Sequence, residues 1–259
     1  MKNGRFKKIE FLNCHWKIDS SDQSNSVSGP SSADVVKVLN STTRLLDLTI
    51  FSNVSAVKVD GCKIDVVGTY SEITAEGIEK VSIRNSRINR ISNLTVVDLE
   101  ELKFETSHLN YISTHAFRFS EIGEVTFKQT KIRELSLRCF EKFQTTSLSF
   151  DFCWVGTISS ELFPYVTMKQ FIVNNTHVGV IEKNSFINYS AEKIEILNSK
   201  INEIKTSPFL DAEVIDLQIF SGFVYTIKVI FVKKKTTALS IGVSTISFNY
   251  TSFALKNFC

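Results

Sequence analysis

Apolar and small polar residues recur along the chain in one frame, written apolar-x-apolar-x-x-small polar-x-apolar-x-x-apolar. The first clear unit contains Val57, Val59, Cys62, Ile64 and Val67. Six further units occupy residues 81–91, 102–112, 125–135, 148–158, 171–181 and 194–204, so the period is 21 to 24 residues. A period of this length predicts a solenoid, because one coil cannot bury its own apolar face and stacked coils share a core.

A second landmark follows the frame in five successive units. Three residues and one small or apolar residue come after the last apolar position, and then a phenylalanine. These phenylalanines are Phe117, Phe140, Phe163, Phe186 and Phe209. We expect the first two apolar positions to flank one outward residue on a short strand, the strands to form a parallel sheet, and the phenylalanines to close the opposite wall.

The frame and the phenylalanine resemble the extracellular leucine-rich-repeat family, whose pattern is LxxLxLxxNxLxxI followed by xxxaF. Here Ile, Val and Phe replace most leucines, and Cys, Ser or Thr stands at the family's Asn position. A hydroxyl or thiol donates one hydrogen bond where an amide donates two, so looser coil turns are expected. The resemblance implies a right-handed coil with a parallel concave β-sheet. The alternative is a right-handed parallel β-helix.

The predicted domain organisation is a single solenoid over residues 1–259. The repeats are clearest in 57–209, and residues 210–259 are expected to be irregular or degenerate. Earlier units fit at Ile9, Phe11, Cys14 and Trp16, and at Val36, Val38 and Ser41. Later units fit at Ile215 and Leu217, and at Leu239, Ile241, Ser244 and Ile246.

The stretch SFDFCW, residues 149–154, tests this frame. Simple alternation would bury Phe150, Phe152 and Trp154 together. The frame instead places Phe150 and Cys153 inside and turns Asp151, Phe152 and Trp154 outward, because the strand ends after three to five residues.

One outward column follows the small polar position. It contains Lys63, Arg87, His108, Lys131, Trp154, His177 and Lys200, with His15 in the same position of the first unit. Aromatic residues among cations are typical of interface anchors. The predicted contact surface is Arg87, Lys131, Phe152, Trp154, Ile172 and His177. The other interpretation is an ordinary solvated face, and Glu101, Glu105, Glu124 and Asp151 are expected to dilute its positive charge.

Little points to catalysis. The sequence lacks phosphate-loop, dinucleotide, zinc-protease and nucleophile-elbow motifs, and its five cysteines form no metal-binding spacing, so no catalytic residue, metal or cofactor is predicted. A net charge of +3 gives no reason to expect a nucleic-acid partner. Asp151 beside Lys128 and Lys131 is the one candidate for the enzyme alternative, a β-helix that acts on polysaccharides.

Localisation is expected to be extracellular or at the cell surface, although the first residues of this chain do not form a signal peptide. Six predicted glycosylation sites carry the Asn-x-Ser/Thr sequence: Asn40, Asn53, Asn93, Asn174, Asn188 and Asn249. Residues 217–232 are apolar and precede Lys233, Lys234 and Lys235, but this run is short for a membrane span and contains Lys228. We therefore expect a non-catalytic protein-binding module or part of a receptor ectodomain, with membrane association the less favoured possibility.

Overall fold

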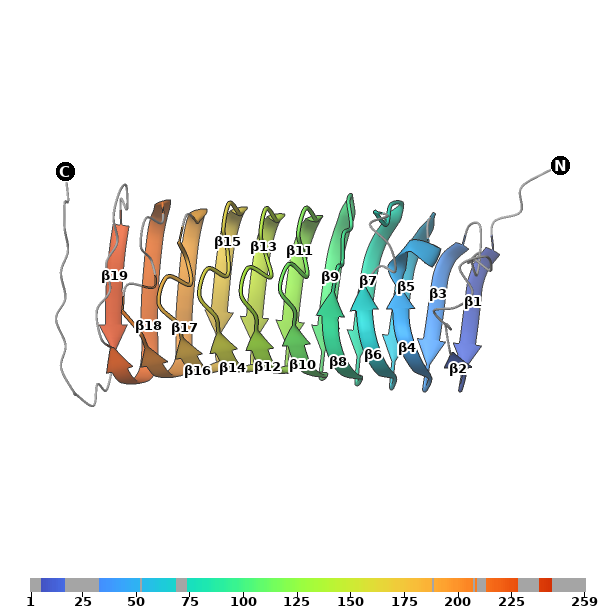
Figure 1. Ribbon diagram of the computed structural model, residues 1–259, viewed down its shortest axis with the longest axis horizontal. Helices are drawn as coiled ribbons and strands as arrows, with labels where there is room; N and C mark the ends of the chain where they lie inside the picture. Colours follow the sequence, from blue (N-terminus) through green and yellow to red (C-terminus); the bar gives the residue numbers. More distant parts are fainter. Residues whose placement is uncertain are drawn as a thin grey trace.

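The protein is a parallel β-solenoid. The computed structural model describes residues 6–16, 33–51, 53–68, 74–187, 189–206, 208, 213–227 and 238–243. Nearly all regular structure in these ranges is strand, and the short 3-10 helix η1 (Leu48–Phe51) is the exception. The coils stack side by side along a nearly straight axis (Figure 1). The predicted solenoid is thus confirmed.

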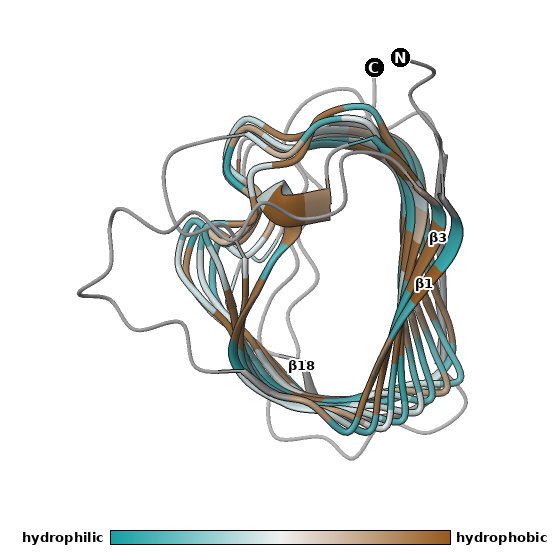
Figure 2. Ribbon diagram, turned by 90° about the vertical axis from the view of Figure 1, so that its right-hand side faces the viewer, coloured by the Kyte–Doolittle hydropathy of each residue, from teal (hydrophilic) through white to brown (hydrophobic). Residues whose placement is uncertain are grey.

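Two ladders of parallel strands form two sides of the coil, and the return segments form the third (Figure 2). The first ladder consists of β1 (Phe6–Leu12), β3 (Ala33–Leu39), β5 (Val54–Asp60), β7 (Ile78–Arg84), β9 (Leu99–Glu105), β11 (Glu121–Lys128), β13 (Gln144–Asp151) and β15 (Thr167–Asn174). The second consists of β2 (His15–Trp16), β4 (Thr42–Asp47), β6 (Lys63–Gly68), β8 (Arg87–Ser92), β10 (His108–Ile112), β12 (Lys131–Leu135), β14 (Trp154–Ile158) and β16 (His177–Ile181). We call their outward surfaces the long face and the short face.

At the C-terminal end, the strands span both ladders. β17 (Ser190–Ile204) pairs with β15 and then with β16, and β18 (Glu213–Ile227) follows β17 in parallel. β19 (Ala238–Val243) pairs with the first part of β18. Residues 217–227 of the apolar run are thus strand, and among the described residues no helix is long and apolar enough to cross a membrane. Residues 228–235 lie outside the described ranges.

The repeat frame defines the core. All of its positions in the seven units from Val57 to Ile204 are buried. Phe104, Phe127 and Phe150 stack in consecutive coils with 4.9 Å between ring centroids. The return phenylalanines Phe117, Phe140, Phe163 and Phe186 form a second buried stack at 5.0 to 5.3 Å, whereas Phe209 lies outside the described residues. The inward sides of both strand ladders and the return phenylalanines are buried against the adjacent coils, so the stability of each coil depends on its neighbours.

The register corrects one predicted unit. Leu217 and Ile219, rather than Ile215 and Leu217, continue the frame, because they pair with Ile194 and Ile196. Apolar residues at 215, 217 and 219 satisfy the alternation in either register, so the pattern alone could not choose between them. The earlier units and the pair Leu239–Ile241 are in the expected register, whereas Ser244 and Ile246 lie outside the described residues.

A corner joins the long strand to the short strand in each coil, and a ladder of small polar side chains fills it. We call this set the corner ladder: Cys14, Ser41, Cys62, Ser86, Ser107, Thr130, Cys153, Thr176 and Ser199. Thr176 shows its hydrogen bonds. The Cys153 N–H donates to the Thr176 hydroxyl oxygen at 3.1 Å, and this hydroxyl donates to the Asn174 carbonyl at 2.8 Å. One small hydroxyl or thiol in each coil therefore bonds the buried backbone at the corner, in place of the amide of the family pattern.

The residue before each corner-ladder residue has a left-handed backbone. These residues are Asn13, Asn40, Gly61, Asn85, Thr106, Gln129, Phe152, Asn175 and Asn198, with φ between 47° and 65°. Asparagine and glycine tolerate this conformation at little cost, whereas other residues lose about 1–2 kcal/mol in it. The left-handed residue turns the chain, so residues before and after it face different sides of the coil.

Replacing Thr176 with Val tests the corner ladder. The variant keeps the side-chain shape but leaves the buried Cys153 N–H without its acceptor, so the free energy of unfolding should fall by about 1–3 kcal/mol. Urea denaturation measures this loss. Thr157→Val on the short face is the matched control and should change stability by less than about 0.5 kcal/mol. Equal effects of the two substitutions would contradict the role of the corner ladder.

Candidate functional site

The predicted outward column exists and runs along the start of the short face. The pairing register places the residues in the order Lys63, Arg87, His108, Lys131, Trp154, His177 and Lys200 on β6, β8, β10, β12, β14, β16 and β17. Strands lie about 4.8 Å apart, so this short-face column is about 29 Å long. Four of the six predicted contact residues, Arg87, Lys131, Trp154 and His177, belong to it.

Trp154 lies half-buried against the short face. The Lys131 Nζ stands 4.9 Å from its ring centroid, a cation–π contact, and the His177 ring meets it edge-on at 6.5 Å. Gly156 leaves room for the indole, since a Cβ at this position would approach Trp154 Cη2 to 3.0 Å and the Arg133 carbonyl oxygen to 2.3 Å. Glycine at residue 156 thus lets the ring lie close to the backbone.

Phe152 and Ile172 occupy other surfaces. Phe152 is the left-handed corner residue and is 57% exposed. Ile172 pairs with Ser149 on the long face. The six predicted contact residues therefore span the short face, the corner and the long face. The orientations expected for Phe150, Phe152 and Cys153 are as the repeat frame predicted, with Phe150 and Cys153 buried.

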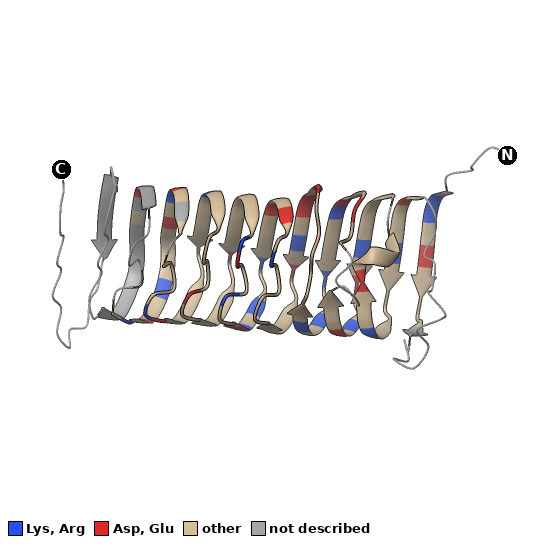
Figure 3. Cartoon of the chain, turned by 45° about the horizontal axis from the view of Figure 1, so that its top comes forward, with Lys and Arg blue, Asp and Glu red and all other residues tan. Residues whose placement is uncertain are grey.

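The acidic residues expected beside the column lie on the long face instead. Glu101 and Glu105 belong to β9, Glu124 to β11 and Asp151 to β13. Figure 3 shows acidic and basic bands mixed on the long strands. Glu105 contacts Arg84 at 2.6 Å and Lys103 at 2.7 Å, and Lys103 lowers the pKa of its carboxyl. Glu105 thus neutralises cations of its own face rather than those of the short-face column.

The short face has an excess of cations. On β8, β10 and β12 the outward charges are Arg87, Arg90, Lys131 and Arg133 against a single acid, Glu134. Among the described residues, no carboxylate lies within ion-pair distance of these four cations. The guanidinium of Arg133 instead lies 5.6 Å from the Tyr111 ring centroid.

The excess of cations on the short face affects the pKa of His108. Its side chain lies in the column between Arg87 and Lys131, and burial followed by repulsion from Lys131 and Arg87 lowers its pKa. The imidazole is therefore neutral at neutral pH. An anion bound between the flanking cations would raise this pKa, because it would compensate their charge.

The residues that could have served in catalysis or metal binding have structural roles instead. Asp151 lies opposite Lys128 in register and accepts a hydrogen bond from the Asn174 side chain at 3.2 Å. Lys131 belongs to the short face. Burial raises the pKa of the Cys153 thiol to about 11, so this corner-ladder cysteine is a poor nucleophile. In the described part of the chain no three His, Cys, Asp or Glu side chains gather as metal ligands.

The predicted glycosylation sites differ in accessibility. Asn40, Asn53 and Asn93 are exposed and have left-handed backbones. Asn174 is half-buried and hydrogen-bonds Asp151 and Asn198. Asn188 and Asn249 lie outside the described residues. The first three sites are thus the better placed for a bulky glycan.

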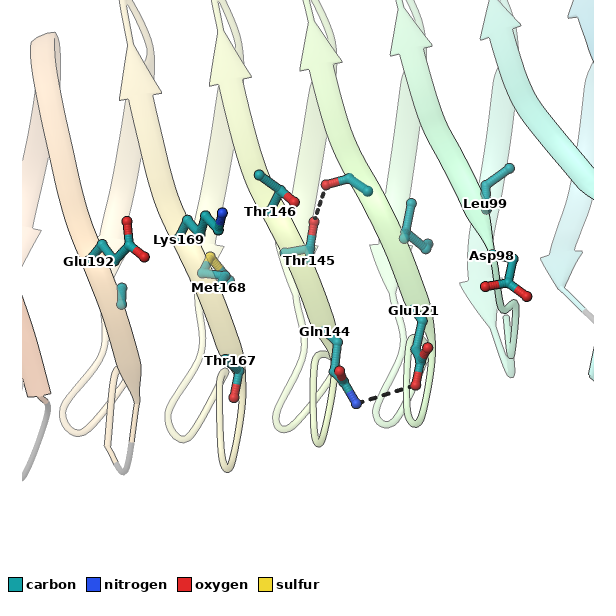
Figure 4. Close-up of a pocket in the computed structure, with 13 residues that line it drawn as sticks. Asp98, Leu99, Glu121, Gln144, Thr145, Thr146, Thr167, Met168, Lys169 and Glu192 are labelled. Atoms are coloured by element: carbon teal, nitrogen blue, oxygen red, sulfur yellow. Dashed lines mark hydrogen bonds between the residues drawn. The ribbon is translucent and has the colours of Figure 1, made fainter.

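A second surface feature was not predicted from the sequence. A groove of about 690 Å³ crosses the starts of β9, β11, β13, β15 and β17 on the long face (Figure 4). It follows the solenoid axis, so we call it the axial groove. Short side chains open it, because Gly123 has none and Thr145 stands where Leu99, Ile122 and Met168 fill the other coils. The small residues Thr145, Thr146 and Ser147, which precede the first apolar position of their unit, could have indicated the groove from the sequence.

Neither a scan against protein-family models nor a search of curated proteins finds a match to this chain.

A charge-matched pair of triple variants tests the separation of charge between the faces. Arg87→Ala/Lys131→Ala/Arg133→Ala removes cations without carboxylate partners, whereas Arg84→Ala/Lys103→Ala/Lys193→Ala removes the same charge from ion-paired positions. The first variant should elute from heparin at clearly lower salt than the second, because only unpaired cations bind a polyanion strongly. Identical elution would show that the short face has no excess positive potential.

Replacing Phe152 with Asn tests the backbone strain at the corner. The variant should raise the free energy of unfolding by about 1 kcal/mol, because Asn accepts the left-handed backbone and the exposed phenyl ring contributes little burial. Thermal and urea denaturation measure the change. Phe152→Leu retains the strain and should not stabilise. Equal stability of both variants would argue against strain at residue 152.

Proposed function

We propose that this chain is a non-catalytic, extracellular protein-binding module of the leucine-rich-repeat type, or part of a receptor ectodomain. Its contact surface is the short-face column together with Phe152 at the corner. One observation carries the proposal. Four short-face cations near Trp154, namely Arg87, Arg90, Lys131 and Arg133, have no carboxylate within ion-pair distance among the described residues, whereas Arg84, Lys103 and Lys193 of the long face are ion-paired.

The surface matches the chemistry of an interface. Unpaired Arg and Lys side chains attract an acidic partner and speed its association. Trp154 supplies an apolar ring with a polar edge, and tryptophan and arginine are the residue types most enriched among binding hot spots. A column about 29 Å long is comparable to the width of a patch of about 800 Å², the area that a standard interface buries on each partner. The partner is therefore expected to present acidic groups around an apolar side chain.

The conformation of Phe152 supports the same surface. An exposed phenylalanine with φ of 52° adds strain without adding burial. In five other coils asparagine occupies the equivalent position. Strain that does not stabilise the fold is a feature of functional sites. The Phe152 ring next to the column is accordingly assigned to partner contact.

A binding screen with matched variants tests the proposal. Wild-type protein, Trp154→Ala, and Lys131→Glu/Arg133→Glu are each presented to a panel of secreted and cell-surface protein domains. A partner should bind the wild type, lose about 2 kcal/mol of affinity with Trp154→Ala, and lose at least as much with the double charge reversal. Lys103→Glu/Lys193→Glu on the long face is the control and should bind as the wild type does.

Two results would contradict the proposal. One is a partner whose affinity changes with the long-face variant but not with the short-face variants. The other is cleavage of a polysaccharide by the wild-type chain, which would favour the enzyme alternative. Circular dichroism of each variant separates loss of binding from loss of folding.

A further inference from the structure

The axial groove has a regular construction along its length. One rim consists of the exposed side chains Asp98, Glu121, Gln144 and Thr167, which come from consecutive coils (Figure 4). The opposite rim consists of Thr146, Lys169 and Glu192, one position beyond the core-facing residue of each coil. The groove crosses five coils, so it is about 19 Å long, and the strands that form it run across it.

The floor of the groove is largely apolar. Ile122, Met168 and Ala191 lie beneath it with little exposed surface, and Gly123 leaves the backbone open. A Cβ at residue 123 would lie 2.6 Å from the Glu100 carbonyl oxygen, so this position cannot carry a side chain without a shift of the backbone. The opening at this coil is thus a feature of the backbone.

The middle of the groove is polar without charge. Gln144, Thr145, Thr146 and Thr167 can each donate and accept hydrogen bonds. The Gln144 amide donates to Glu121 at 3.3 Å, and the Thr145 hydroxyl donates to the Gly123 carbonyl at 3.0 Å, which leaves acceptor positions on both side chains. Such a set of groups matches ligand hydroxyls, each of which also donates and accepts.

The charges at the groove exclude several classes of ligand. Of the thirteen described residues that line it, Asp98, Glu121 and Glu192 are acidic and Lys169 is the one cation. A polyanion would meet net repulsion, and a purely apolar chain would leave the polar rims without partners.

The repeat distance separates a sugar chain from a peptide. An extended peptide advances about 3.3 Å per residue, which does not match the spacing of about 4.8 Å between coils. The length that one ring adds to an extended, β-linked hexose chain is close to this coil spacing. Its axial C–H faces suit an apolar floor, and its hydroxyl edges suit polar rims on both sides.

We propose that the axial groove binds a linear, neutral, β-linked polysaccharide, which lies along the solenoid axis with about one sugar ring per coil. The groove is a second binding site, independent of the short-face column, and binding is non-covalent. About four rings fill it, one for each of the four intervals between the five strands. The two rims contact the hydroxyl edges, and the floor around Gly123 and Met168 contacts the ring faces.

Methyl NMR of the full chain tests this assignment. The chain has two methionines, so a sample labelled at the methionine methyl groups gives two signals, and Met168→Leu identifies the one from the groove. The probes are the β-1,4-linked hexasaccharides of glucose, mannose and N-acetylglucosamine. At least one should shift the Met168 signal saturably. Its tetrasaccharide should bind within about threefold of the hexasaccharide, and its disaccharide at least tenfold more weakly, as expected for four rings at one per coil.

Matched variants of one strand locate the binding site. Thr146→Trp places a large ring on the rim of the groove and should weaken binding at least tenfold. Ser149→Trp lies three residues away on the same strand, outside the groove, and should leave the affinity within about twofold of wild type. Trp154→Ala on the short face should not change it, so this site and the proposed protein interface can fail separately.

Three outcomes would overturn the assignment. No shift of the Met168 signal with any of the three hexasaccharides is the first. Binding that survives Thr146→Trp unchanged is the second. Equal or tighter binding of an extended uncharged peptide, such as a Ser/Thr-rich hexapeptide, is the third and would assign the groove to a peptide instead.

Discussion

The hydrogen bonds of the corner ladder set the register of the solenoid. In six of the eight successive pairs of corner-ladder residues, the backbone N–H of one donates to the hydroxyl or thiol of the next, as the Ser41 N–H does to Cys62 Sγ and the Ser86 N–H to the Ser107 hydroxyl. Loss of register would leave these buried groups without partners, which is costly. The apolar stacks and the outward columns depend on the same register, so one chain of hydrogen bonds aligns both the core and the surfaces.

The corner also sorts charge between two faces. Residues up to Asp151 belong to the long strand and those from Trp154 to the short strand, with a left-handed residue between them. Acidic residues that are near the cations in sequence, such as Asp60 before Lys63, therefore lie on the other side of the corner. Ion pairs hold Arg84, Lys103 and Lys193 on the long face, and the short face keeps its excess of cations. A small net charge of +3 conceals this separation.

The interior of the fold could be predicted from the sequence, and the surfaces only in part. Seven units repeat the same burial, so the positions of residues such as Phe150 and Cys153 followed from the frame alone. The angle at the corner did not follow, because it depends on backbone torsion, and Ile172 was therefore grouped with Trp154 although they face different sides. The axial groove depends on Gly123 and Thr145, whose small size matters only once their coils are stacked. A repeat pattern reports which residues face inward, but the shape of the outside depends on neighbours about 23 residues apart.

The positions of the two surfaces let them act together. The axial groove crosses the starts of the long strands, whereas the short-face column begins after their ends, so the length of a strand and a corner separate them. The six residue steps from Thr145 to Asp151 span about 20 Å of extended chain. A partner seated on Trp154 would leave the groove open, and a chain in the groove would leave Trp154 free. Since both features repeat along the same axis, a solenoid of this kind can hold an extended ligand on one face and present a second face to a protein.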